Sequence, residues 1–149
     1  MDNVFVTPPL RGWILVAGRR MLGNGDEGSV HAIEKRLIEL SKQFGEAQAF
    51  ATERIVEYHH WVLVKQGVLT RAFAFLGEKG EILTNVGEIT PAEEGFQWEG
   101  LPEFEWTPGE EEVMEVAGQW SIDPSDLGEV EDRDRMGVLG KMPNGQIER

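Results

Sequence analysis

The alternation of large and small side chains over residues 68–76 is the feature that most constrains the fold. Phe73 and Phe75 alternate with Ala72 and Ala74, and successive residues of an extended chain point to opposite faces. One face of this predicted strand is therefore bulky and the other is small. The small face would let a helix approach the sheet closely.

Neighbouring segments extend this strand into an antiparallel meander. Residues 55–64 alternate in a similar way, and Lys65-Gln66-Gly67 joins them to the next strand. A second turn at residues 77–80 leads to a strand over residues 81–85. Because connections this short join antiparallel neighbours, we expect these three strands to lie side by side.

Two further segments bring the meander to about five strands. Residues 46–52 are a weaker strand candidate, and residues 12–17 form an apolar run with glycine at or beside each end. A short apolar run between turn residues is typical of a fully buried strand. We therefore expect residues 12–17 to form a buried strand.

Residues 30–44 carry the pattern of an amphipathic helix. Apolar residues recur at steps of three and four and form one stripe; they are Val30, Ile33, Leu37, Leu40 and Phe44. Ser29 is the candidate N-cap, and Gly45 is the candidate residue just beyond the C-terminus. This long helix is the one that we expect on the small face of the sheet.

Three short segments share a helix-start pattern of capping residue, proline, any residue and acid. They are T-P-A-E at 90–93, T-P-G-E at 107–110 and D-P-S-D at 123–126. Proline suits the first helical position, and the acid returns a hydrogen bond to the capping residue. The second segment predicts a helix from residue 107 to about residue 119. The acids Glu93, Glu110 and Asp126 are then capping groups.

Together these elements predict an α+β fold. It is an antiparallel meander of about five strands, with one long helix packed on a face and a second, C-terminal helix at an edge or on the other face. We expect residues 1–127 to form a single domain and residues 128–149 to form a C-terminal tail. Val138, Leu139 and Met142 are the residues able to dock this tail on the domain.

Negative charge is concentrated in the second half of the chain. Residues 1–75 carry 9 Lys and Arg against 8 Asp and Glu, whereas residues 76–149 carry 5 against 19. Phosphates would be repelled by such a surface, so the charge argues against nucleic acid and anionic lipid and favours a basic protein partner. The alternative is that the acidity only keeps the protein in solution.

Large aromatic residues are interleaved with these acids. The pattern F-x-W occurs at 96–98 and again at 104–106. Aromatic rings with acidic rims can hold Lys and Arg through cation–π and ion-pair contacts. The predicted partner-binding residues are Trp98, Glu99, Glu103, Phe104, Glu105, Trp106, Glu111, Glu112 and Glu115. The alternative is that the rings cover one end of the sheet.

No motif indicates a catalytic residue, a metal or a cofactor. The chain has no Cys, which excludes thiolate chemistry and disulfides. His59 and His60 are adjacent on a predicted strand and point to opposite faces, so they cannot chelate one ion. We expect structural histidines; the alternative is a catalytic His paired with Glu57 or Arg71.

Residues 23–28 match the pattern G-x-G-x-x-G between a predicted strand and a predicted helix. A dinucleotide would place its pyrophosphate at this loop. Asp26 and Glu27 would then bring two negative charges to the phosphate position, so we expect a connector and no cofactor.

Targeting signals are not recognisable in the chain. No apolar run approaches the roughly 20 residues of a membrane span. Residues 1–10 lack the basic start and apolar stretch of a secretory signal. We therefore expect a cytoplasmic protein that does not bind a membrane.

Three segments carry a resemblance to a known group of proteins: R-I-V-E-Y-H-H-W at 54–61, R-A-F-A-F-L-G-E-K-G-E at 71–81 and V-A-G-Q-W-S-I-D-P at 116–124. They resemble a family of small bacterial proteins that is similar to immunity proteins, which neutralise a toxin delivered between bacteria. The resemblance covers most of residues 12–127 and brings no catalytic signature. It implies a non-enzymatic inhibitor that occludes a basic partner, such as a toxin encoded nearby.

Two other classes of function stay open at this point. One is an enzyme or a carbohydrate-binding module that uses Trp98, Trp106 and glutamates in a cleft. The other is a structural or regulatory subunit of an oligomer, which would carry a large apolar face. The sequence leaves the oligomeric state open.

Overall fold

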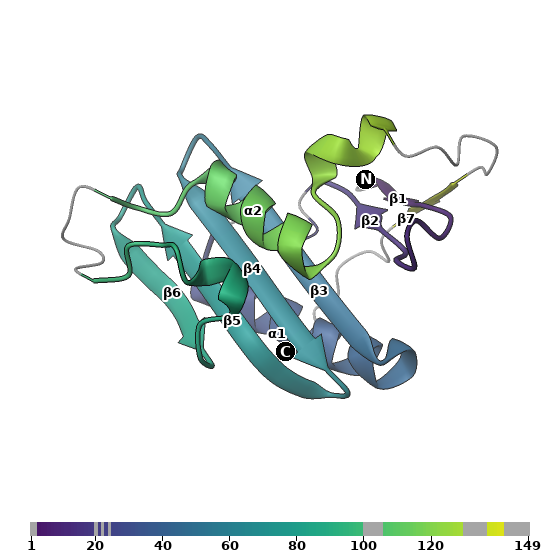
Figure 1. Ribbon diagram of the computed structural model, residues 1–149, viewed down its shortest axis with the longest axis horizontal. Coiled ribbons are helices and arrows are strands. Elements are labelled where there is room, and N and C mark those ends of the chain that lie inside the picture. The colour runs from purple at the N-terminus through teal and green to yellow at the C-terminus, as the bar shows by residue number, and fades with distance from the viewer. Residues whose placement is uncertain are drawn as a thin grey trace. The chain divides into compact units, whose positions relative to one another are not determined.

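The computed structural model describes residues 3–19, 21, 23, 25–99, 106–129 and 137–141. The chain divides into two compact units (Figure 1). The larger is Leu22–Pro124, and the smaller combines Met1–Met21 with Ser125–Arg149. Each unit has its own antiparallel sheet.

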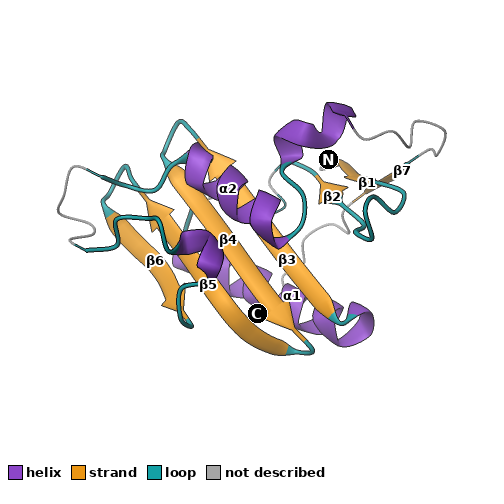
Figure 2. Cartoon of the chain, in the orientation of Figure 1, coloured by secondary structure: helices purple, strands orange, loops and turns teal. Residues whose placement is uncertain are grey.

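The larger unit is built on a four-stranded antiparallel meander in the order β3-β4-β5-β6. Its strands are β3 (Glu46–Glu53), β4 (Tyr58–Lys65), β5 (Val68–Leu76) and β6 (Glu81–Val86). Helix α1 (Glu27–Phe44) packs on one face, and the short helix η1 (Pro91–Glu93) and helix α2 (Glu110–Trp120) lie on the other (Figures 1 and 2). The predicted α+β class is confirmed, with the long helix on a face of the sheet and a second helix after the strands.

The turn between β4 and β5 is the tight hairpin that the sequence predicts. Gln66 and Gly67 have φ values of 49° and 78°. A two-residue hairpin turn of this kind needs positive φ at both central positions, which glycine adopts without strain.

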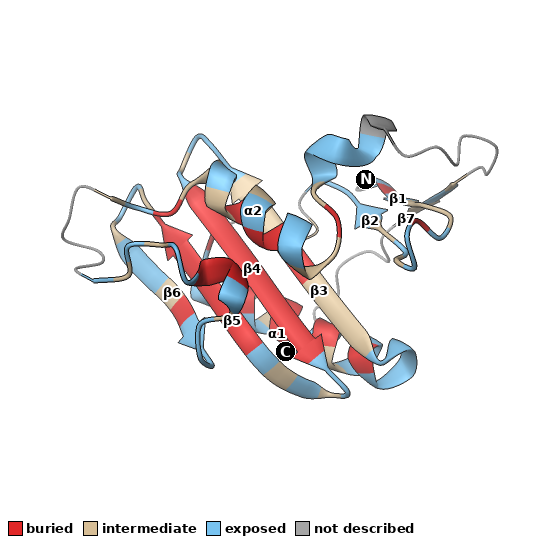
Figure 3. Cartoon of the chain, in the orientation of Figure 1, coloured by how far each residue is buried: buried red, intermediate tan, exposed pale blue. Residues whose placement is uncertain are grey.

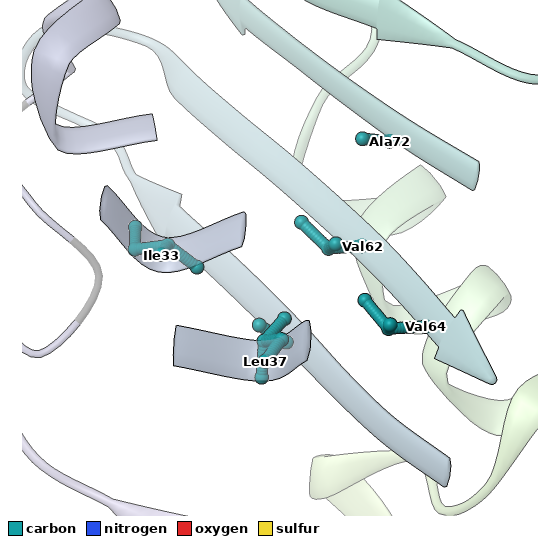
Figure 4. Close-up of a cluster of buried hydrophobic side chains, with 6 residues drawn as sticks. Ile33, Leu37, Val62, Val64 and Ala72 are labelled. Carbon is teal, nitrogen blue, oxygen red and sulfur yellow. The ribbon is translucent and has the colours of Figure 1, made fainter. Parts of the chain in front are cut away.

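Helix α1 packs on the small face of β5, as expected. Ile33 and Leu37 of the helix lie against the sheet in the cluster drawn in Figure 4. Its buried members are Ile33, Leu37, Ala49, Val62, Val64 and Ala72. Farther along the same face, Val30 packs with Ala74. Each fully buried Ile, Leu or Val side chain contributes roughly 1.5–3 kcal/mol to stability.

Helix α1 starts one turn earlier than predicted. Its N-cap is Asp26, whose Oδ1 accepts a hydrogen bond from the backbone N of Ser29 at 2.7 Å. The prediction of Ser29 as N-cap was therefore wrong, because the carboxylate three residues before it binds the free amide of the first turn. Gly45, with φ 88°, ends the helix as expected.

The buried stripe of α1 also differs at its C-terminal end. Leu40 and Phe44 are exposed, whereas Glu34 and Ser41 are buried. Both polar residues are hydrogen bonded: Glu34 Oε1 accepts from Thr84 Oγ1 at 3.2 Å, and Ser41 Oγ accepts from Gly67 N at 2.8 Å. Ser41 therefore fastens the helix end to the β4–β5 turn, a long-range bond that apolar periodicity does not reveal.

The bulky face of the sheet is covered by η1 and α2. Its buried cluster consists of Trp61, Phe73, Phe75, Ala92, Val113 and Val116. Strand β4 is buried at seven of its eight residues, since both of its faces are covered (Figure 3).

The first two helix-start patterns do not behave alike. In the first, Thr90 N and Thr90 Oγ1 both donate to Glu93 Oε2 at 2.8 Å, as predicted. In the second, the predictions of Thr107 as cap and of Glu110 as its capping acid were wrong. Gly109 is the N-cap, and its N donates to Glu112 Oε2 at 2.7 Å. Residues 110–112 are all Glu, and each could accept a hydrogen bond from a backbone amide at the helix start. Which of them does so depends on where the helix packs.

The smaller unit holds the sheet β2-β1-β7, formed by β1 (Asn3–Val6), β2 (Val16–Ala17) and β7 (Val138–Lys141). The expected buried strand at residues 12–17 was wrong. Only Val16 and Ala17 are in a strand, and both are exposed. The reason is that β2 pairs with β1 over two residues at a sheet edge. β7, which pairs with β1, lies within residues 128–149, and η2 (Pro124–Glu129) precedes it.

Enlarging the small face of the sheet should destabilise the protein. We expect Ala72→Leu to lower the free energy of unfolding by about 1–3 kcal/mol, because the added carbons would push into the α1 cluster. Urea denaturation measures this change. Thr70→Leu, on the same strand at an exposed position, is the control and should change stability by no more than about 0.5 kcal/mol. Wild-type stability of Ala72→Leu would contradict the close packing of α1.

Candidate functional site

A completely buried ion pair lies on the face of the sheet that α2 covers. Arg71 of β5 is 1% exposed and Glu93 of η1 is 0% exposed. Arg71 Nε donates to Glu93 Oε1 at 2.8 Å and to Oε2 at 3.1 Å. Nη2 also lies 2.8 Å from Oε1, but without the alignment of a hydrogen bond. The two charges are thus held together mainly through Nε.

Further hydrogen bonds tie this pair to several elements. Arg71 Nη1 donates to Asn85 Oδ1 at 2.6 Å and to the carbonyls of Val86 and Gly87 at 3.1 and 3.2 Å. Glu93 Oε1 accepts from Trp61 Nε1 at 2.8 Å. A buried charge is tolerated when it is paired and hydrogen bonded in this way. The network joins η1 to β4, β5 and the end of β6.

The sequence does not predict this network. From its pattern, Arg71 is only an alternative partner for a histidine, and Glu93 is only a capping group. A signal was present, because an Arg inside an otherwise apolar buried strand requires a counter-charge. The choice of Glu93 among many glutamates depends on the fold.

Aromatic rings cover the ion pair. The Arg71 Cζ atom lies 5.4 Å from the centroid of the Trp98 ring, and Trp98 Nε1 donates to the Glu93 carbonyl at 3.0 Å. The rings of Phe96 and Trp106 lie 6.0 and 6.5 Å from the Trp98 ring. These three rings are half-buried. Phe96 and Trp98 therefore pack on the core, which agrees with the alternative that the rings cover one end of the sheet. They are also partly exposed at the surface.

The predicted binding residues have different environments. Trp98 and Trp106 are half-buried, and Glu99, Glu111 and Glu115 are exposed. Glu112 is half-buried and bonded to Gly109 N. The remaining three, Glu103, Phe104 and Glu105, lie outside the described residues. Glu94, which the sequence analysis did not select, is exposed beside Glu93.

We call six of these residues the acidic–aromatic surface: Glu94, Trp98, Glu99, Trp106, Glu111 and Glu115. Within the described ranges, no ion pair includes any of its four glutamates. The neighbouring Glu110 differs, since its Oε2 accepts from Arg54 Nε at 2.6 Å. The negative charge of this surface is therefore not balanced by the Lys and Arg residues of the described chain.

The two adjacent histidines point to opposite faces of the sheet, as predicted. His59 lies between Thr52 Oγ1 at 3.0 Å and Glu57 Oε2 at 3.1 Å. His60 is buried on the α1 face, with Nδ1 2.9 Å from the Tyr58 hydroxyl. Burial lowers the pKa of His60 to about 4, so its ring is neutral at pH 7. In the part of the chain that the structure describes, no cluster of His, Asp and Glu could hold a metal ion.

At the start of α1, the Asp26 carboxylate already accepts the Ser29 amide that an anion would bind. Hydrogen bonds from the backbone and hydroxyl of Ser29 lower the pKa of the Asp26 carboxyl. This carboxylate occupies the position at which a phosphate would bind.

The chain has no match among protein-family models, curated proteins or solved structures. Among the described helices, none has the length and apolar character needed to cross a membrane.

Removing one charge of the buried pair should be strongly destabilising. We expect Glu93→Gln to lower the free energy of unfolding by about 3–5 kcal/mol, because Arg71 would stay buried without a counter-charge. Urea denaturation followed by tryptophan fluorescence measures the loss. Glu94→Gln, one residue away and exposed, is the matched control and should shift stability by about 0.5 kcal/mol at most. Equal effects of the two changes would show that the ion pair has no structural role.

Protonation of His60 should oppose folding in mild acid. The pKa of His60 falls from 6.5 to about 4 on folding. At a pH between these two values, His60 is protonated in the unfolded chain and neutral in the folded protein. Stability should thus decrease by about 2 kcal/mol between pH 7.5 and pH 5. The variant His60→Gln should lack this contribution, whereas His31→Gln, at an exposed position, should retain it. Identical pH dependence of the wild type and His60→Gln would refute the assignment.

Proposed function

We propose that this protein is a cytoplasmic, non-enzymatic binding protein of the immunity type, which occludes a basic partner with its acidic–aromatic surface. The observation that carries the proposal is the combination of exposed, unpaired glutamates with half-buried tryptophans on one layer of the fold. The partner would be a toxin or effector encoded nearby, as the resemblance to immunity proteins implies.

Rigidity of this layer supports the proposal. Glu93 and Trp98 are bonded to each other and to the sheet through Arg71 and Trp61. A surface that is ordered before binding loses less conformational entropy when it associates. The rings are thereby held at the surface by contacts that persist without a partner.

The charge of the surface supports a basic partner. Unbalanced negative charge attracts a positive protein and raises the association rate. A toxin that acts on an anionic substrate carries a basic active site, which these glutamates would cover. Inhibition would then be a competition between the surface and the substrate for the same Lys and Arg residues.

The aromatic part of the surface would slow dissociation. Tryptophan is enriched among the residues that dominate binding energy, where it packs into desolvated pockets. Trp98 already lies over the guanidinium of Arg71 on its inner side. Trp98 and Trp106 would provide the same kind of cation–π contact to a partner's Arg or Lys.

The proposal is tested by reversing the charges of the surface. The variant Glu99→Lys/Glu111→Lys/Glu115→Lys should bind the product of the neighbouring gene at least about tenfold more slowly, since electrostatic steering accelerates association by 10- to 1,000-fold. Stopped-flow or surface-plasmon measurements give this rate. Raising the salt concentration should slow the wild type and have less effect on the variant.

A matched control separates position from net charge. Glu39→Lys/Glu53→Lys/Glu78→Lys makes the same change in total charge at exposed residues elsewhere, and its association rate should stay closer to that of the wild type. An equal loss in both triple variants would refute a localised binding surface. Binding of the wild type that ignores salt would refute the electrostatic mechanism.

A further inference from the structure

The two edge strands of the four-stranded sheet differ in how far they are covered. β3 and β6 are its terminal strands. Both helices pack against β3, and all but one of its residues are at least half-buried. Strand β6 contacts only α1 among the helices, and four of its six residues are exposed. In the described chain, no further strand pairs with either outer edge, and we call the more exposed one, that of β6, the open edge.

The open edge lacks two common protections against strand pairing. Edge strands usually carry Lys or Pro, or are interrupted by a bulge. β6 has no Lys and no Pro. Its irregularity is at Leu83, because Ile82 pairs with Phe75 and Thr84 pairs with Ala74. Leu83 packs on the Val30 cluster, and beyond this bulge Thr84, Asn85 and Val86 pair regularly with β5.

The side chains along this edge have a distinct pattern. Ile82 and Val86 are 38% and 39% exposed. Glu81 precedes them and Glu88 follows them, and both are exposed. Neither glutamate is in an ion pair within the described residues. Ile82 pairs with Phe75 and Val86 pairs with Ala72, so the two apolar side chains flank the edge on opposite faces of the sheet. An edge with an apolar side chain on each face and an acid at each end is complementary to an extended segment with apolar residues between two basic ones.

The end of the edge is held in place from inside. Arg71 Nη1 donates to the carbonyls of Val86 and Gly87. These carbonyls are thus bonded within the fold, and the strand is ordered without a partner. The same arginine anchors Glu93 and lies under Trp98, so the open edge and the acidic–aromatic surface depend on one buried group.

A second copy of this chain is a poor occupant of the edge. Each chain carries a formal net charge of −13, and the repulsion between two such chains opposes self-association.

We propose that β6 accepts an extended basic segment of the partner as a fifth strand of the sheet. Backbone hydrogen bonds along β6 supply affinity, as in other cases of strand addition, and Lys or Arg residues at the two ends of the segment pair with Glu81 and Glu88. The inference rests on the proposed function in one respect, namely that the partner is basic.

A synthetic peptide tests this inference on the full-length protein. The probe is a short, end-capped peptide in which Val and Thr alternate between terminal Lys residues. Its addition to ¹⁵N-labelled protein should shift the amide signals of residues 81–86 and slow the hydrogen exchange of those that face outward. The amides of β3 should not change.

A second peptide isolates the backbone contribution. It has the same charge and a central Pro, which lacks a donor and does not continue an edge pairing. We expect it to bind at least about tenfold more weakly, the loss that removal of one or two net hydrogen bonds produces. Equal binding of the two peptides would overturn strand addition, because only charge would then matter.

Charge reversal on the protein isolates the end contacts. The variant Glu81→Lys/Glu88→Lys should bind the probe about 2- to 30-fold more weakly, the range expected for two exposed ion pairs. The control Glu39→Lys/Glu53→Lys has the same net charge and should bind more nearly as the wild type does. Unchanged affinity of the β6 variant would overturn the predicted end contacts.

The outcomes separate this inference from the proposed function. Signal changes confined to residues 94–99 and 110–115 would overturn strand addition and leave the acidic–aromatic surface in place. Amide signal changes on β6, together with equal association rates of the wild type and the Glu99→Lys/Glu111→Lys/Glu115→Lys variant, would refute the proposed function and retain the edge site. No change on β6, or β6 amides already protected in a dimer without peptide, would overturn the inference.

Discussion

The buried pair of Arg71 and Glu93 is the interaction on which the candidate functional site depends. Both side chains are withdrawn from water, and each charge would cost several kcal/mol if left alone. Hydrogen bonds to Trp61, Thr90 and Asn85 offset part of this cost. Because one partner lies on the sheet and the other on η1, the pair fixes the segment that carries Glu94, Trp98 and Glu99.

The unequal faces of the sheet explain why such an anchor is needed. On the α1 face, alanines let an 18-residue helix lie directly on the strands. On the other face, Trp61, Phe73 and Phe75 project from the sheet, and α2 has only 11 residues. The half-buried rings of Phe96, Trp98 and Trp106 complete the cover. Of these, Trp98 is fixed by a polar contact, the hydrogen bond from its Nε1 to the Glu93 carbonyl.

Glutamates in the acidic half of the chain have two separate roles. Glu93 and Glu112 are used inside the fold, where they hold Arg71 and the start of α2. Glu94, Glu99, Glu111 and Glu115 are exposed and unpaired within the described ranges. Net charge therefore overstates the number of carboxylates that a partner can contact. Among the described glutamates of this half, the proposed partner would contact the exposed set, with Glu81 and Glu88 along the sheet edge.

The sequence by itself determined the elements whose signals are local. Apolar periodicity predicted α1 and the central strands, Gln66-Gly67 predicted the hairpin, and Thr90 with Glu93 predicted a capped turn. Tertiary structure alone decided which charges meet, which end of α1 is covered, and that Val16 and Ala17 join a different sheet. A local pattern involves residues that are close together in the sequence, whereas Arg71 and Glu93 are 22 positions apart. Formation of this ion pair depends on strand register and on where η1 packs, and neither can be deduced from the spacing of residues along the chain.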